Sequence, residues 1–180
     1  MNPQFWIEQF ELKAKSPASW VLQARRLKRA ADLLFAAYVS DHRKMQEDCS
    51  PLDLTNLEIA GPATLFCGLA FENLLKAAII KADGASIENG KLKKWPGTGH
   101  NLIALADAAR IKLTRKQRNL LSRLTAYVEW GGRYPIPMSQ DKMPLKQDGV
   151  SAEWFPLPVQ PHELVDVQNF LEKIETRLLG

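Results

Sequence analysis

The sequence predicts an all-α protein, an up-and-down bundle of four to five main helices with a long proline-rich loop or small β-hairpin before the last helix. Three observations support this prediction. Residues 61–83 are almost all apolar or small, and several other segments carry apolar residues at steps of three and four. Residues 133–161 hold six of the eleven prolines, which excludes a helix there.

The composition is that of an ordinary globular chain, and we expect a single helical domain over residues 1–180. Of the 180 residues, 46% are hydrophobic and 24% are charged, enough for one sizeable core. The net charge of +4 permits an anionic partner without requiring one. Two cysteines, Cys49 and Cys67, cannot form a disulfide framework, and the N-terminal residues lack the basic start of a signal peptide. A cytoplasmic location is therefore expected.

The first helices are predicted from aromatic spacing and from a helix start signal. Residues 1–16 hold three aromatic residues at roughly helical spacing, which indicates a short helix docked on the body. Ser16 and Pro17 form an N-cap and first position, and an apolar stripe follows over residues 20–38. We expect this second helix to reach about residue 45. The basic residues within 25–29 form either a solvated face or a surface for nucleic acid or an acidic partner.

The apolar stretch 61–83 is predicted to be a central helix that the rest of the chain covers. Its apolar residues occupy the whole helix circumference, and Pro62 and Gly84 suit its first turn and its end. The length would also suit a membrane span. Charged residues at mid-span and the lack of a second long apolar run exclude that alternative, so we expect no membrane partner.

The remaining elements follow from glycines, prolines and one capping signal. Residues 84–99 read as a basic loop, followed by a helix over 100–110. Thr114 and Gln117 form a capping box that starts the next helix, and Gly131-Gly132 ends it. Residues 131–161 are expected to form a proline-rich flap, with a hairpin turn at Asp148-Gly149. Pro161 then begins the final helix.

Metal and cofactor sites are not expected. His42, His100 and His162 are far apart in the sequence and have no cysteine at ligand spacing. The sequence has no Walker loop, no dinucleotide glycine fingerprint and no Gly-x-Ser-x-Gly elbow.

The polar residues that the helical pattern does not explain centre on Glu72. A carboxylate in a helix surrounded by apolar residues needs a cation or several donors. Lys76 lies one turn further and can satisfy it locally, whereas Arg133, in a sharp Gly-Gly turn, is the distant alternative. His100 and Asn101 follow at a helix N-terminus, where His100 and Thr98 either cap the helix or face an anion.

Three segments in a fixed order resemble HEPN domains, over roughly residues 17–178. The first is FENLLKAAI around Glu72, which is similar to the second HEPN helix. The second is Gly99-His100-Asn101-Leu102 at the start of the next helix, and the third is Trp130-Gly131-Gly132-Arg133-Tyr134-Pro135 at the end of the helix after that.

The resemblance implies an all-α bundle, often dimeric, from a superfamily common in defence, toxin–antitoxin and RNA-processing systems. Many HEPN proteins are metal-independent ribonucleases whose signature is an arginine, a small polar residue and, several residues later, a histidine. Arg133 matches the arginine, but Tyr134 takes the polar position and no histidine follows in RYPIPMSQDK. The sequence therefore departs from the nuclease signature.

These observations predict a non-catalytic HEPN-like module that binds RNA, a nucleotide or a protein partner, in a defence or toxin–antitoxin setting. The expected ligand-binding residues are Glu72, Lys76, His100, Asn101, Arg133 and Tyr134. One alternative is a ribonuclease with His100 as base and Arg133 stabilising the phosphate. Another is a structural homodimer or complex subunit that uses the exposed part of the 20–38 stripe as its interface.

Overall fold

The computed structural model describes residues 3–48, 59–85, 87–134 and 156–180 and confirms the helical class. The α-helices are α1 Pro3–Lys15, α2 Pro17–Asp48, α3 Ala60–Asp83, α4 Leu102–Ala108, α5 Arg115–Ala126 and α6 Leu164–Leu179. A π-helical turn, Tyr127–Gly131, extends α5, and a 3-10 turn, Pro161–Glu163, precedes α6. The strands are β1 Ile87–Glu88 and β2 Lys91–Leu92.

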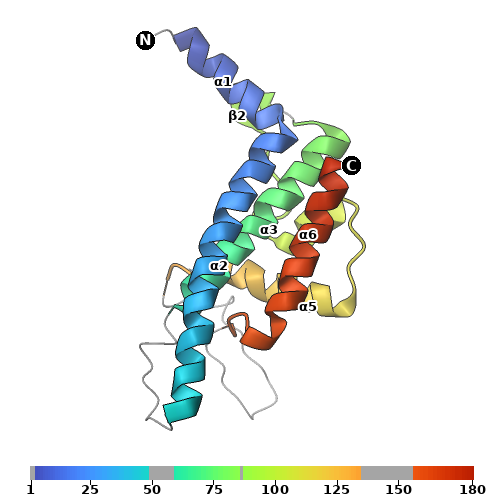
Figure 1. The fold of residues 1–180 in the computed structure, drawn as a ribbon. Coiled ribbons are helices and arrows are strands. Elements are labelled where there is room, and N and C mark those ends of the chain that lie inside the picture. The colour runs from blue at the N-terminus through green and yellow to red at the C-terminus, as the bar shows by residue number, and fades with distance from the viewer. Residues whose placement is uncertain (1–2, 49–58, 86, 135–155) are drawn as a thin grey trace.

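Three helices lie side by side along the long axis of the molecule (Figure 1). α2 and α3 run in opposite directions, and α6 runs alongside α3 in the same direction as α3 (Figure 1). Both α4 and α5 pack against α3. α3 is therefore in contact with every other long helix of the body.

α3 is the core helix that the sequence predicts. Thirteen of its 24 residues are buried, and Ala63, Phe71 and Leu75 are fully inaccessible to solvent. Among the described residues, α3 is the one helix with the length and hydropathy of a membrane span, and 72% of its most apolar window is buried inside the protein. Its apolar surface is thus covered by the other helices.

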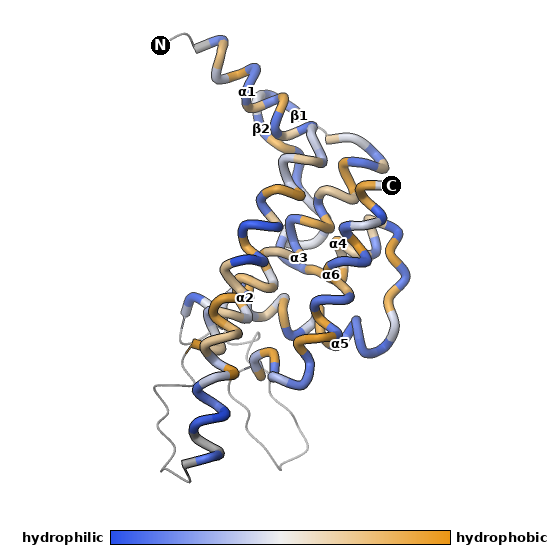
Figure 2. The backbone as a smooth tube through the Cα atoms, viewed as in Figure 1, coloured by the Kyte–Doolittle hydropathy of each residue, from blue (hydrophilic) through white to orange (hydrophobic). Residues whose placement is uncertain are grey.

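The apolar stripe of α2 is used for this covering. Ala24, Ala31, Phe35 and Tyr38 are buried in the core that α2 shares with α3. α3 therefore covers much of this stripe, whereas Trp20, Leu27 and Leu34 remain partly exposed, and the interface expected on the exposed remainder stays a prediction. The end of α2 beyond the body is mostly hydrophilic (Figure 2).

The expectation that the N-terminal helix docks on the body is wrong. α1 projects from the body (Figure 1), and the side chains of Phe5, Trp6 and Phe10 remain 50%, 55% and 40% exposed. Its apolar residues are spread around the helix, so no single face can be buried against α2. Only the last turn is held, where Trp20 Nε1 donates to the Ala14 carbonyl at 3.2 Å.

A hairpin within residues 84–99 was not predicted. β1 and β2 pair antiparallel, with Ile87 opposite Leu92 and Glu88 opposite Lys91. Asn89 and Gly90 between the strands have φ of 52° and 71°, as a two-residue type I′ turn requires. The hairpin predicted at Asp148-Gly149 lies outside the described residues.

Helix ends largely follow the predicted signals. Thr114 and Gln117 form the capping box of α5, and Gly84 ends α3 with a φ of 77°. The predicted 100–110 helix is shorter, because Asn101 caps α4 and the Ile111 amide donates to the Ala106 carbonyl at 2.9 Å, beyond the last turn.

The end of the proline-rich segment returns to α3. The Thr64 hydroxyl accepts a hydrogen bond from the Val159 amide at 3.0 Å and donates to the Ala60 carbonyl at 2.7 Å. Tyr127 Oη donates to the Pro156 carbonyl at 2.7 Å. These bonds place the chain so that α6 starts beside α3.

Cys67 on α3 serves as a small hydrophobic residue. Its side chain is buried, and burial raises the pKa of its thiol to about 12. A thiol with this pKa carries almost no thiolate at neutral pH, so Cys67 is unreactive in the folded protein.

Gly68 tests how closely α3 packs against α5. A Cβ at Gly68 would lie 2.6 Å from Val128 Cγ2 and 3.3 Å from the Leu124 carbonyl oxygen. We expect Gly68→Ala to lower the free energy of unfolding by about 1–3 kcal/mol, measured by urea denaturation. Gly61→Ala is the control in the same helix, since its Cβ would meet only Tyr127 Cε1 at 3.9 Å. Equal stability of the two variants would contradict this close packing.

Candidate functional site

Glu72 is the centre of the polar site. Its side chain is 8% exposed, and each carboxylate oxygen has a partner. Oε1 accepts from Lys76 Nζ at 2.6 Å, and Oε2 lies 2.9 Å from His100 Nδ1. The local pairing with Lys76 is the one that helical spacing predicts. The distant pairing with Arg133 does not occur, and His100 takes that place.

Lys76 is buried, and its ammonium group contacts Glu72 and two tryptophan rings. Its ammonium lies 5.9 Å from the centre of the Trp20 ring and 5.4 Å from that of the Trp95 ring. The two indoles meet edge to face, with centroids 5.4 Å apart. Because Trp20 belongs to α2 and Trp95 to the segment before α4, Lys76 joins three elements through cation–π and ionic contacts. These contacts are structural, and the predicted role of Lys76 in ligand binding stays a prediction.

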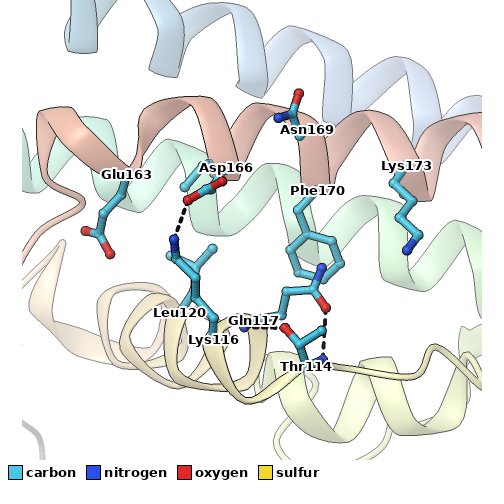
Figure 3. A pocket seen from close by; sticks show the side chains of 10 residues that line it. Thr114, Lys116, Gln117, Leu120, Glu163, Asp166, Asn169, Phe170 and Lys173 are labelled. Carbon is cyan, nitrogen blue, oxygen red and sulfur yellow. Dashed lines mark hydrogen bonds and ion pairs between the residues drawn. The ribbon is translucent and has the colours of Figure 1, made fainter.

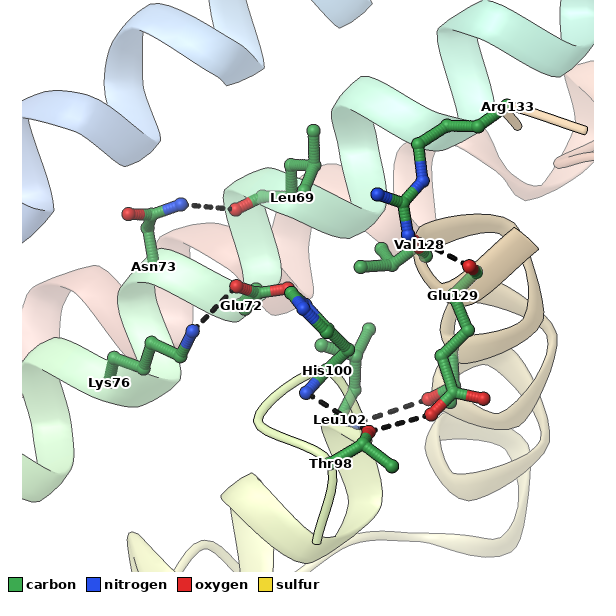
Figure 4. A network of polar contacts seen from close by, with 11 residues as sticks. Leu69, Glu72, Asn73, Lys76, Thr98, His100, Leu102, Val128, Glu129 and Arg133 are labelled. Carbon is green, nitrogen blue, oxygen red and sulfur yellow. Dashed lines mark hydrogen bonds and ion pairs between the residues drawn. The ribbon is translucent and has the colours of Figure 1, made fainter. Parts of the chain in front are cut away.

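His100 is positioned from two directions (Figure 4). Its Nδ1 meets Glu72, and its backbone amide donates to Thr98 Oγ1 at 3.3 Å. Thr98 in turn donates to Glu129 Oε1 at 2.7 Å, which connects the segment before α4 with the end of α5. The imidazole side chain is still 44% exposed. A carboxylate that accepts from Nδ1 leaves the Nε2 lone pair available to a ligand.

Asn101 is occupied by helix capping. Its Oδ1 accepts from the Ala104 amide at 3.0 Å, and the neighbouring Leu102 amide donates to Thr125 Oγ1 at 3.0 Å. Asn101 therefore has an N-cap role, and its predicted role in ligand binding stays a prediction. The cap assigned to His100 and Thr98 belongs to Asn101 instead.

Arg133 turns back onto the helix that it follows. Its Nη2 donates to the Val128 carbonyl at 2.5 Å and to the Glu129 carbonyl at 2.8 Å. The last carbonyls of a helix have no partner within the helix, so they are ready acceptors for a nearby guanidinium. Arg133 lies over the Tyr134 ring at 5.6 Å, and both residues are exposed.

The polar contacts of the site involve residues from three elements (Figure 4). Glu72 comes from α3, His100 from the segment before α4, and Arg133 from the end of the π-helical turn. Among the residues that the structure describes, no group of three His, Cys, Asp or Glu side chains could hold a metal ion. The arrangement offers an oriented imidazole and an exposed guanidinium as its chemical groups.

Sequence reasoning missed Glu129 and Trp95 as parts of this site, and it assigned Thr98 to a helix cap or an anion contact, not to a bond with Glu129. Thr98 and Trp95 lie in the loop that brings His100 to Glu72, and no periodic pattern in a loop predicts where it goes. Glu129 falls among apolar residues at the end of α5, and only the π-helical turn directs it to Thr98.

The chain matches no protein-family model, no curated protein and no solved structure. The relation to HEPN domains therefore depends on the sequence motifs given above.

The buried Glu72–Lys76 pair gives a stability prediction. Lys76→Met keeps the length of the side chain but removes the cation from a carboxylate that is 8% exposed. We expect a loss of about 3–5 kcal/mol in the free energy of unfolding, because a buried charge loses its partner. The double variant Glu72→Gln/Lys76→Met should recover part of this loss.

The control is Lys44→Met, at an exposed position on α2, which should leave the unfolding free energy nearly unchanged. A Lys76→Met protein as stable as the wild type in chemical denaturation would show that the pair contributes nothing.

Proposed function

We propose that this chain is a non-catalytic HEPN-like module, with the up-and-down bundle of that superfamily, and that it binds RNA through His100, Arg133 and Tyr134. The observation that carries the proposal is the 2.9 Å contact between Glu72 and His100. It holds an imidazole in a fixed orientation at the surface, and Arg133 and Tyr134, which follow the π-helical turn, are exposed as well.

RNA offers a chemical counterpart to each of these three groups. An exposed guanidinium attracts a phosphate group, and an exposed tyrosine ring can stack on a base. The free nitrogen of an oriented imidazole can accept a hydrogen bond from a ribose 2′-hydroxyl, the group that distinguishes RNA from DNA. A protein partner would not offer a counterpart to all three of these groups.

Glu72 and Lys76 act behind this surface as positioning residues. Glu72 fixes the imidazole, and Lys76 offsets the charge of Glu72 within the core. Neither side chain is exposed enough to contact an RNA strand, since both are 8% accessible.

The absence of the second signature residue favours binding over cleavage. No histidine follows Arg133 before residue 162. The Nη2 of Arg133 also donates hydrogen bonds to two backbone carbonyls. This group is therefore not free to stabilise the full charge of a pentacoordinate phosphate.

A metal-independent ribonuclease is the second candidate. Glu72 orients the imidazole as a carboxylate orients the general base of many acid–base catalysts, which favours this activity. In that case His100 would accept the 2′-hydroxyl proton and Arg133 would stabilise the phosphate.

A homodimeric or scaffold role is favoured by a different observation. α1 exposes Phe5, Trp6, Ile7 and Leu12 at 50–63%, a set that a partner could cover. This role is compatible with RNA binding at the His100 surface.

The RNA proposal is tested by fluorescence anisotropy with a short single-stranded RNA, in EDTA and at several salt concentrations. We expect Arg133→Ala to weaken binding about tenfold and to reduce the slope of log affinity against log salt by about 0.7. The matched control is Arg115→Ala, an exposed arginine at the start of α5 with no ion pair among the described residues. Equal loss in both variants, or none in either, would contradict the proposal.

The same samples distinguish binding from cleavage. Intact RNA on a denaturing gel after long incubation supports the binding module. Fragments that disappear in both His100→Ala and Arg133→Ala would establish the ribonuclease instead. A thermal melt of each variant separates loss of function from loss of the fold.

A further inference from the structure

A hollow on the surface, away from His100, is lined by basic side chains. It lies between α6 and the connection from α4 to α5 and has a volume of about 340 Å³. Its lining residues are Arg110, Ile111, Lys112, Gln117, Phe170, Lys173, Ile174 and Arg177. Four of these are cations and none is an acid. We call this hollow the α5–α6 groove.

Most of this positive charge has no acidic partner. Arg110 forms an ion pair with Asp83 at 2.8 Å, where both side chains are largely exposed. Among the described residues, Lys112, Lys173 and Arg177 pair with no carboxylate, and Arg177 Nη1 makes a 3.4 Å hydrogen bond to the Arg110 carbonyl. Exposed like charges repel one another, so the groove favours an anion.

The local backbone fixes these cations around the groove. Arg110 has a φ of 55°, in the left-handed region that follows a helix end, and this turn directs residues 110–112 toward α6. Lys173 and Arg177 are four residues apart on α6 and therefore share one face. Two like charges at this spacing destabilise a helix slightly, a cost that a bound anion would remove.

The floor of the groove is apolar. Phe170 and Ile174 are buried in α6, and Ile111 packs against the core beside them. Phe170 and Lys173 point from α6 toward the start of α5 (Figure 3). An apolar floor edged by cations suits a ligand with a flat ring and phosphate groups, and the volume lies in the range of small-ligand pockets.

We propose that the α5–α6 groove binds the phosphate groups of a nucleotide, with the base resting on the apolar floor. Lys112, Lys173 and Arg177 contact the phosphates, and Gln117, whose Oε1 accepts from the Thr114 amide, offers its free NH₂ to the ligand. The groove and the His100 surface flank opposite ends of α4, so this site does not depend on the RNA function proposed above.

Isothermal titration calorimetry with the full chain tests the groove, using ATP in EDTA in one arm and a short single-stranded RNA in the other. The variant is Lys112→Ala/Lys173→Ala, which removes two exposed cations without an acidic partner. We expect it to lower the affinity about tenfold or more, and to make the remaining binding less dependent on salt. Inorganic tripolyphosphate as a third ligand reports how much the base contributes.

Two controls make the result specific. Arg43→Ala/Lys44→Ala removes two exposed cations from the far end of α2 and should leave the affinity unchanged. Arg133→Ala should bind ATP as the wild type does, so failure of the RNA proposal and failure of this one are distinguishable. Lys112→Arg/Lys173→Arg keeps the charges and should restore binding.

The outcomes are decisive. Binding of ATP that the double alanine variant loses identifies a free nucleotide as the ligand, and the same loss with RNA alone identifies the phosphates of an RNA strand. No binding of either by the wild type at millimolar concentration would overturn the proposal. So would equal affinity of the wild type and the double alanine variant.

Discussion

The buried carboxylate of Glu72 sets the arrangement around it. Desolvating a carboxylate is costly, so it persists in the core only with partners on both oxygens. Lys76 satisfies one of them from the same helix, and Trp20 and Trp95 enclose the lysine. His100 satisfies the other from a separate segment. One ionised group thereby fixes α2, α3 and the segment before α4 in relation to one another, and gives the surface imidazole its orientation.

Local signals predict the fold, whereas non-local contacts decide the site. The capping box of Thr114, the end of α3 at Gly84 and the pairing of Glu72 with Lys76 each depend on residues within four positions, and each is found. The hairpin at Asn89 also has a local signal, because the pair Asn89-Gly90 is typical of a two-residue turn. His100 reaches Glu72 across 28 positions, and the path of the intervening loop has no periodic signature.

Arg133 bonds to nearby backbone carbonyls and not to the distant carboxylate of Glu72. The sequence places it beside a helix end, and a helix end leaves carbonyls without partners. Those carbonyls belong to Val128 and Glu129, only five and four residues away, so bonding to them orders little additional chain. Reaching Glu72 would have required the guanidinium to displace His100.

The positions of the charged side chains say more about a binding partner than the net charge does. A net charge of +4 is compatible with almost any partner. The body neutralises many of its cations one by one, as in Arg25–Glu175 at 2.5 Å and Arg123–Glu163 at 2.6 Å. In the second pair Glu163 keeps a lowered pKa although its burial acts to raise it, because the Gln160 amide and Arg123 both donate to it. Lys173, by contrast, has no acidic partner among the residues that the structure describes, although α6 also carries glutamates. Most cations of the α5–α6 groove differ in this respect from the paired cations of the body, among the residues that the structure describes. An anion bound in the groove would supply the negative charge that they lack.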